Sequence, residues 1–113
     1  IHCPSNDSTH HLFGAEQFEK MKKYAFLVNT ARGPIVDEQA LVDALQAREI
    51  AGAGLDVFEF EPKINQGLLD RDDVVLIPHL GSATTETRDA MAMLAANNAV
   101  AIANGRAPLT PVS

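Results

Sequence analysis

The sequence predicts an α/β fold, part of a doubly wound parallel sheet of the Rossmann type that ends in a long C-terminal helix. Short apolar segments without polar alternation are typical of strands that are covered on both faces of a parallel sheet. Along this chain they alternate with segments of helical periodicity. That spacing is typical of βαβ units, whose crossovers we expect to be right-handed.

The first half of the chain is expected to supply two strands and two helices. Residues 1–3 read as the end of a strand, and residues 4–8 read as a loop because proline lacks a backbone donor and Ser, Asn and Asp favour turns. A short helix over 15–22 and a strand over 25–29 follow. Asp37 is the expected N-cap of the next helix.

The second half is expected to add two more strands and the long helix. The strands are predicted over 52–57 and 74–77, and the helix over 85–104. Thr84 is the expected N-cap of this helix, and Gly105 is expected to end it, since glycine readily adopts the left-handed conformation that follows a helix.

Composition bounds the function. The 113 residues are 46% hydrophobic and 21% charged, which fits one globular unit or less. The net charge is −6, and the nine Lys and Arg residues are scattered, which argues against a nucleic acid or an anionic membrane as partner. A single cysteine can form no internal disulfide, and no apolar run reaches the length of a membrane span, so we expect a cytoplasmic protein. Because the chain begins at Ile1 without a methionine, we expect a fragment.

Functional groups follow three of the predicted strands. Arg32 follows the 25–29 strand, Asp56 lies in the next strand with Glu61 beyond it, and His79 follows the 74–77 strand. Parallel strands end at one edge of a sheet, so these groups are expected to share a crevice there. An arginine grips a carboxylate through two parallel hydrogen bonds, and a histidine beside a carboxylate can exchange protons near neutral pH. This set suits interconversion of a 2-keto and a 2-hydroxy acid.

The other histidines are expected to be ordinary surface residues. His10 and His11 form an adjacent pair near a helix start, and a metal site there would need further ligands that the sequence does not offer nearby. No metal is predicted.

Three segments resemble the D-isomer-specific 2-hydroxyacid dehydrogenases. They are Asn-Thr-Ala-Arg-Gly at 29–33, Ala-Gly-Ala-Gly-Leu-Asp-Val-Phe at 51–58 with Glu61-Pro62 after it, and Pro-His-Leu-Gly-Ser-Ala-Thr at 78–84. Within the family the chain looks closest to the glyoxylate and hydroxypyruvate reductases. The resemblance implies reduction of a small 2-keto acid to the D-2-hydroxy acid with NAD or NADP, in a protein that is commonly a homodimer.

The resemblance also implies roles for individual residues. Arg32 matches the arginine that binds the substrate carboxylate and carbonyl oxygen, and His79 matches the proton donor for that oxygen. Glu61 matches the glutamate paired with the histidine; Glu59 is the alternative, and the family's Glu-Pro pairing favours Glu61. The residues implied to bind the cofactor are Cys3, Pro4, Thr30, Ala31, Arg32, Asp56, His79 and Gly81.

The chain departs from the family in what it lacks. The G-x-G-x-x-G loop that places a pyrophosphate on a helix N-terminus is absent. We therefore expect residues 1–113 to be the C-terminal part of an NAD(P)-binding domain, with 85–113 a helix and tail that return toward a substrate domain, and we expect the chain alone to be inactive. The alternative is a non-catalytic dinucleotide-sensing scaffold, like the corepressor branch of the same family.

Overall fold

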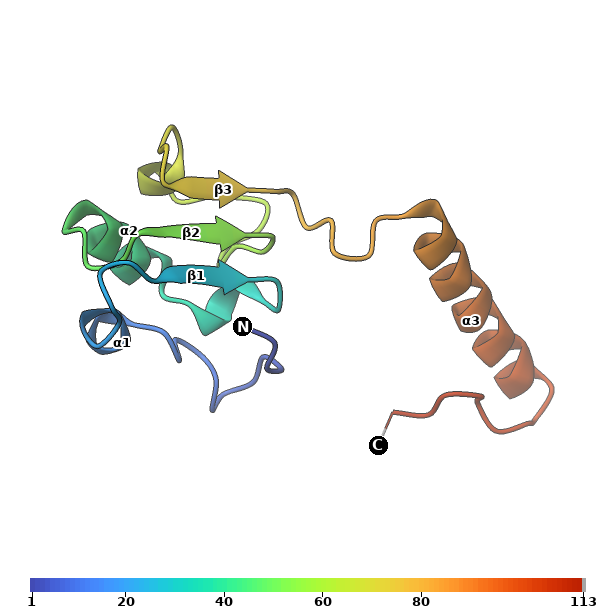
Figure 1. The fold of residues 1–113 in the computed structure, drawn as a ribbon. Coiled ribbons are helices and arrows are strands. Elements are labelled where there is room, and N and C mark those ends of the chain that lie inside the picture. Colours follow the sequence, from blue (N-terminus) through green and yellow to red (C-terminus); the bar gives the residue numbers. More distant parts are fainter. Residues whose placement is uncertain (113) are drawn as a thin grey trace. The chain divides into compact units, whose positions relative to one another are not determined.

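The predicted parallel sheet is confirmed in a computed structural model of the chain, which describes residues 1–112. Three strands lie in the order β1-β2-β3, and both neighbouring pairs are parallel (Figure 1). The strands are β1 (Phe26–Asn29), β2 (Gly52–Leu55) and β3 (Val74–Leu76). Because all three run the same way, their carboxyl ends meet at one edge of the sheet.

The helices are α1 (Ala15–Glu19), α2 (Glu38–Gln46) and α3 (Thr85–Ala103), with short 3-10 helices η1 (Gly33–Ile35) and η2 (Gln66–Leu68). Both predicted N-caps are confirmed: Asp37 accepts from the Ala40 amide at 3.0 Å, and Thr84 accepts from the Thr87 amide at 3.2 Å. Helix α1 is shorter than predicted, because the chain turns after it to enter β1.

The expected strand end at residues 1–3 is wrong, since these residues form no ladder. The terminal amine of Ile1 donates to the Val28 carbonyl oxygen at 2.7 Å, which places Ile1 beside β1 through a single hydrogen bond.

The core lies between one face of the sheet and helices α1 and α2. Leu27 and Leu55 point from the sheet into a buried cluster that contains Phe18 of α1 and Leu41 of α2. On the other face, Phe26 is 68% exposed and Val75 is 66% exposed. The prediction that the strands are buried on both faces is therefore wrong for this chain, because the helices of residues 1–81 cover only one face.

The described chain from Ser82 onward forms a second compact unit. In it, the Asn98 side chain accepts from the Leu109 and Thr110 amides at 2.7 and 3.2 Å and so fixes the tail on α3. Gly105 has φ +71, as predicted for the residue that ends the helix. Within residues 1–112, no helix has both the length and the hydropathy of a membrane span.

Two glycines of β2 make a matched test of the sheet. A Cβ added to Gly52 would collide with the Asp73 carbonyl oxygen, whereas a Cβ added to Gly54 would meet the Val28 side chain at 3.8 Å, an ordinary contact. Gly52→Ala is expected to lower the free energy of unfolding by about 1–3 kcal/mol, as overpacking does. Gly54→Ala should leave it unchanged or raise it. Urea unfolding followed by circular dichroism measures both, and equal losses would contradict the strand arrangement.

Candidate functional site

A buried asparagine shapes the turn that follows β1. Asn29 is 1% exposed, its Oδ1 accepts from the Ala31 amide at 3.0 Å, and its Nδ2 donates to the Arg32 carbonyl oxygen at 2.9 Å. The side chain thus replaces the backbone pairing that ends with the strand. Sequence reasoning assigned Asn29 no role of its own, although a polar residue that closes an apolar strand is a usable signal.

The turn presents Arg32 with an available guanidinium. Arg32 is exposed, and its Nη1 donates to the Ala31 carbonyl oxygen at 2.7 Å. Within residues 1–112, its side chain forms no salt bridge. A guanidinium carries five N–H donors in a fixed fork, so most of them are free for an anionic ligand.

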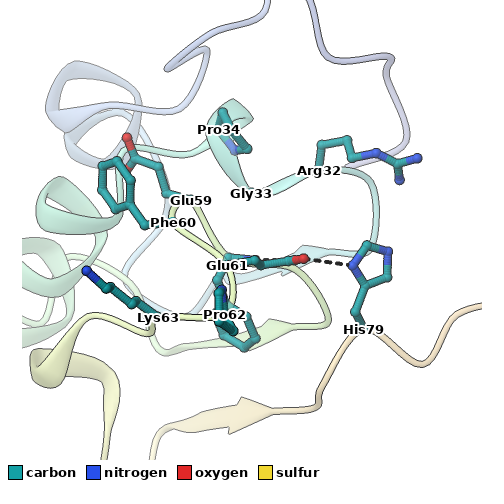
Figure 2. Close-up of a pocket in the computed structure, with 10 residues that line it drawn as sticks. Arg32, Gly33, Pro34, Glu59, Phe60, Glu61, Pro62, Lys63 and His79 are labelled. Atoms are coloured by element: carbon teal, nitrogen blue, oxygen red, sulfur yellow. Dashed lines mark hydrogen bonds and ion pairs between the residues drawn. The ribbon is translucent and has the colours of Figure 1, made fainter.

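Glu61 and His79 are in direct contact, as Figure 2 shows. Glu61 Oε2 lies 3.0 Å from His79 Nδ1, and Glu61 Oε1 accepts from the Phe58 amide at 3.0 Å. The hydrogen bond from His79, and then that from Phe58, hold the pKa of Glu61 below its ordinary value. Glu61 is therefore an acceptor at neutral pH, and His79 Nδ1 must carry the proton of the shared hydrogen bond. This leaves His79 Nε2 as the ring nitrogen available to a ligand.

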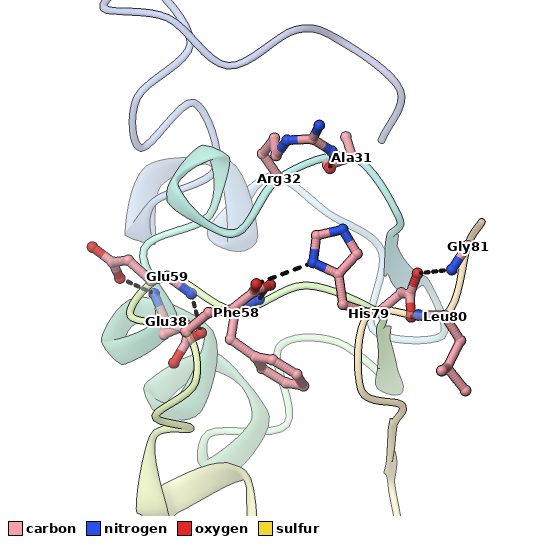
Figure 3. A network of polar contacts seen from close by, with 10 residues as sticks. Ala31, Arg32, Glu38, Phe58, Glu59, His79, Leu80 and Gly81 are labelled. Carbon is pink, nitrogen blue, oxygen red and sulfur yellow. Dashed lines mark hydrogen bonds and ion pairs between the residues drawn. The ribbon is translucent and has the colours of Figure 1, made fainter. Parts of the chain in front are cut away.

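Asp56 fixes the backbone that follows His79, a segment whose His79, Leu80 and Gly81 are labelled in Figure 3. Asp56 is 3% exposed, and its carboxylate accepts from the Leu80 amide at 2.6 Å and from the Gly81 amide at 2.9 Å. His79 itself has φ +53, a backbone conformation that costs a non-glycine residue energy. The Asp56 contacts stabilise the segment in which this conformation occurs.

The site residues line two neighbouring hollows that share Arg32. The first, of about 540 Å³, includes Arg32, Glu61 and His79 in its lining. The second, of about 560 Å³, is lined by His2, Cys3, Pro4, Ser5, Thr30, Ala31 and Arg32. The structure thus brings the predicted catalytic residues to one hollow and five of the predicted cofactor residues, Arg32 among them, to the next. Asp56 and Gly81 line neither hollow, and they contact one another behind His79.

Glu59 contacts a different histidine from Glu61. Its Oε1 lies 2.7 Å from His11 Nε2, so the fold brings to His10 and His11 a carboxylate that the sequence did not indicate. Nitrogen and oxygen atoms of His10, His11 and Glu59 lie within 4.8 Å of one another, which corrects the expectation that no further metal ligand is near. Glu59 Oε2 also accepts from the Glu38 amide at 3.2 Å. Hydrogen bonding therefore accounts for the positions of His11 and Glu59 without an ion.

Comparison with known proteins assigns the family. The model of the family described as D-isomer specific 2-hydroxyacid dehydrogenase, NAD binding domain, matches residues 1–81. The chain belongs to this family. It is 49% identical over 108 residues to a Staphylococcus haemolyticus protein named as a 2-hydroxyacid dehydrogenase, a match that covers 96% of this chain and 34% of the relative.

Solved structures of family members share the fold. An NADPH-dependent glyoxylate/hydroxypyruvate reductase from Sinorhizobium meliloti, in complex with NADP and malonate, matches all of this chain and 35% of its own, with a TM-score of 0.96 and 42% identity. A D-lactate dehydrogenase with NAD⁺ from Lactobacillus jensenii matches 99% of this chain and 38% of its own, with a TM-score of 0.84 and 34% identity. The chain thus spans about a third of the length of these relatives.

The family's NAD-binding domain, as matched here, contains every candidate residue described above. All of them lie within residues 1–81, the compact unit that holds the sheet. The Glu61 and His79 contact also distinguishes the two acids of the loop, since Glu59 lies against His11 instead.

The Glu61 contact predicts a pH effect. Because His79 lowers the pKa of Glu61, ionised Glu61 contributes stability above its unfolded-state value of 4.5, and this contribution is lost as the pH falls through the folded-state pKa. His79→Ala is expected to return the Glu61 pKa toward 4.5. Carboxyl ¹³C NMR titration of the chain measures this, with His10→Ala as control. An unchanged Glu61 pKa in His79→Ala would contradict the contact.

Proposed function

We propose that the full-length protein containing this chain is an NAD(P)-dependent D-2-hydroxyacid dehydrogenase that reduces a small 2-keto acid, of the glyoxylate or hydroxypyruvate type. The observation that carries the proposal is the Glu61–His79 pair beside the Arg32 guanidinium, which forms no salt bridge within residues 1–112, at the carboxyl edge of the sheet. The names of the structural neighbours support the small keto acid, since they include a glyoxylate/hydroxypyruvate reductase.

Each of the three side chains has a distinct task in this proposal. Arg32 binds the substrate carboxylate and polarises the keto oxygen through its free N–H groups. His79 donates a proton from Nε2 to that oxygen as the carbonyl is reduced, and takes it back in the reverse direction. Glu61 holds Nδ1, orients the ring and stabilises the imidazolium before the proton is given up.

The residues around the second hollow fit a dinucleotide. Cys3, Pro4, Thr30 and Ala31 surround an open hollow that meets the first one at Arg32, so a group held there would lie beside the proposed substrate site. When bound, the dinucleotide supplies the hydride that reduces the carbonyl carbon. Asp56 and Gly81 are proposed to lie at the nicotinamide end of the dinucleotide, with Asp56 accepting from its carboxamide. Both NAD and NADP are compatible with these residues, because the residue that would contact the adenosine ribose at its 2′ position, where the two dinucleotides differ, is not among them.

Replacement of His79 tests the assignment. In the full-length protein, His79→Ala is expected to lower kcat for keto-acid reduction by roughly 10²–10⁴-fold, the usual contribution of general acid catalysis. His10 is exposed and lines neither hollow, so His10→Ala is the control and should leave kcat unchanged. Stopped-flow reduction of glyoxylate and hydroxypyruvate gives the values. Dinucleotide binding with no turnover by the parent protein would favour the sensing scaffold instead.

The 113-residue chain alone is expected to show no turnover. It spans about a third of its relatives and contains no G-x-G-x-x-G loop, so it lacks the group that binds a pyrophosphate. Purified chain mixed with NADH or NADPH and glyoxylate should show no loss of absorbance at 340 nm beyond the rate without protein. A measurable, enzyme-dependent rate would contradict this expectation.

A further inference from the structure

The segment that carries Glu61 has few apolar anchors. It runs from residue 58 to residue 65, between β2 and η2, and we call it the Glu61 loop. Phe58 is buried at its start and Ile64 packs against the core near its end, but Phe60, Glu61, Pro62 and Lys63 between them are exposed. Exposed stretches with few buried contacts open easily, so polar contacts are needed to fix residues 59–63 between these two anchors.

Two glutamates fix the Glu61 loop to α2 in a reciprocal manner, as Figure 3 shows. The Glu59 amide donates to Glu38 Oε1 at 2.6 Å, and the Glu38 amide donates to Glu59 Oε2 at 3.2 Å. Glu38 is the first residue of α2, so its amide is one of those that a helix leaves unpaired. Each carboxylate thus satisfies the backbone donor of the other residue.

The same Glu38 carboxylate also holds the far end of the loop. Its Oε2 accepts from the Asn65 amide at 3.3 Å. One side chain therefore connects residues 59 and 65, the two ends of the exposed stretch. His11 adds a third attachment through its 2.7 Å contact with Glu59 Oε1.

Glu38 holds this position at an energetic cost. The residue is 3% exposed, and burial raises the pKa of its carboxyl despite the two backbone hydrogen bonds. A buried charge is a poor way to gain stability alone. A role in fixing the loop backbone accounts for the carboxylate, because two oxygens are needed to accept from two separate amides.

We propose that Glu38 is a positioning residue for His79, since it fixes the backbone of the Glu61 loop and thereby the carboxylate that orients the imidazole. The path is short: the Glu59 amide that Glu38 binds is one residue from the Phe58 amide, which donates to Glu61 Oε1. Glu61 Oε2 then meets His79 Nδ1. The catalytic part of this inference rests on the proposed function, and the structural part does not.

Glu38→Gln tests the structural part in the 113-residue chain. A glutamine has one acceptor oxygen and an NH₂ group that cannot accept, so either the Glu59 or the Asn65 amide loses its partner. We expect faster hydrogen exchange at one of these amides, a Glu61 pKa moved toward 4.5 and a shifted His79 Nδ1 ¹⁵N resonance. Glu49→Gln is the control, because the Glu49 carboxylate has no hydrogen bond within residues 1–112. An unchanged Glu61 pKa and His79 resonance in Glu38→Gln would overturn the inference.

Glu38→Asp keeps the test decisive if Glu38→Gln does not fold. Aspartate keeps the charge and both oxygens but withdraws them by one methylene group, so the same loss of the Glu61–His79 contact is expected. A folded Glu38→Asp chain with parent-like Glu61 and His79 signals would equally overturn the inference.

Kinetics of the full-length protein test the catalytic part. Glu38→Gln is expected to lower kcat about 10-fold with KM nearly unchanged, within the roughly 10²-fold loss that a misplacement of 1 Å can cause. In a Glu61→Gln background it should lower kcat no further, because residues that act through one another are not additive. Parent-like kcat, or a full additional loss in the double variant, would overturn the positioning role. A parent protein without turnover would instead overturn the proposed function, and the NMR result would still decide the structural part.

Discussion

The parallel register of β1, β2 and β3 is the constraint on which the rest of the site depends. Three strands that run the same way must release the chain at one edge, and there the structure places Arg32, Glu61 and His79 around one hollow. In the sequence, 28 residues lie between Arg32 and Glu61 and 17 lie between Glu61 and His79, yet all three side chains line the same hollow. The fold supplies proximity, so the loops need only supply orientation.

Side-chain oxygens that accept from backbone amides supply that orientation. Asn29 shapes the turn before Arg32, Glu38 holds the Glu61 loop, and Asp56 holds the segment after His79. All three are buried, between 1% and 3% exposed, so their hydrogen bonds are shielded from competing water. Each of the three proposed catalytic groups is thus positioned by one such residue: Arg32 by Asn29, Glu61 by Glu38 and His79 by Asp56. Gly33 adds a close approach of backbone to backbone, because a Cβ there would collide with the Phe58 carbonyl group.

The sequence indicated those features that depend on local pattern. The N-caps Asp37 and Thr84 follow from residue type and spacing, and the functional groups Arg32 and His79 follow from their places after apolar strands. Glu61 was favoured over Glu59 only through the family's Glu-Pro pairing, and the structure places Glu61 against His79. Contacts that join distant segments left no such pattern. The reciprocal hydrogen bonds between Glu38 and Glu59 join residues 21 positions apart, and the contact of His11 with Glu59 joins residues 48 positions apart. Any residue except proline can donate its backbone amide, so such hydrogen bonds leave no signal in the identity of the donor residue.

The pKa values of Glu61 and Glu38, the two acids that hold the Glu61 loop, are shifted in opposite directions. The direction of each shift determines how pH changes the stability that the acid contributes. Hydrogen bonding from His79 lowers the pKa of Glu61, so its stabilising contribution is present above pH 4.5 and is lost as the pH falls. Burial raises the pKa of Glu38, so the folded chain binds that proton more tightly than the unfolded chain does, and stability falls as the pH rises from 4.5 through the raised value. Both side chains act as hydrogen-bond acceptors: Glu61 accepts from the His79 imidazole, and Glu38 accepts from two backbone amides. The loop therefore orients His79 through two carboxylates with opposite effects on folding: ionisation of Glu61 stabilises the folded chain, and ionisation of Glu38 destabilises it.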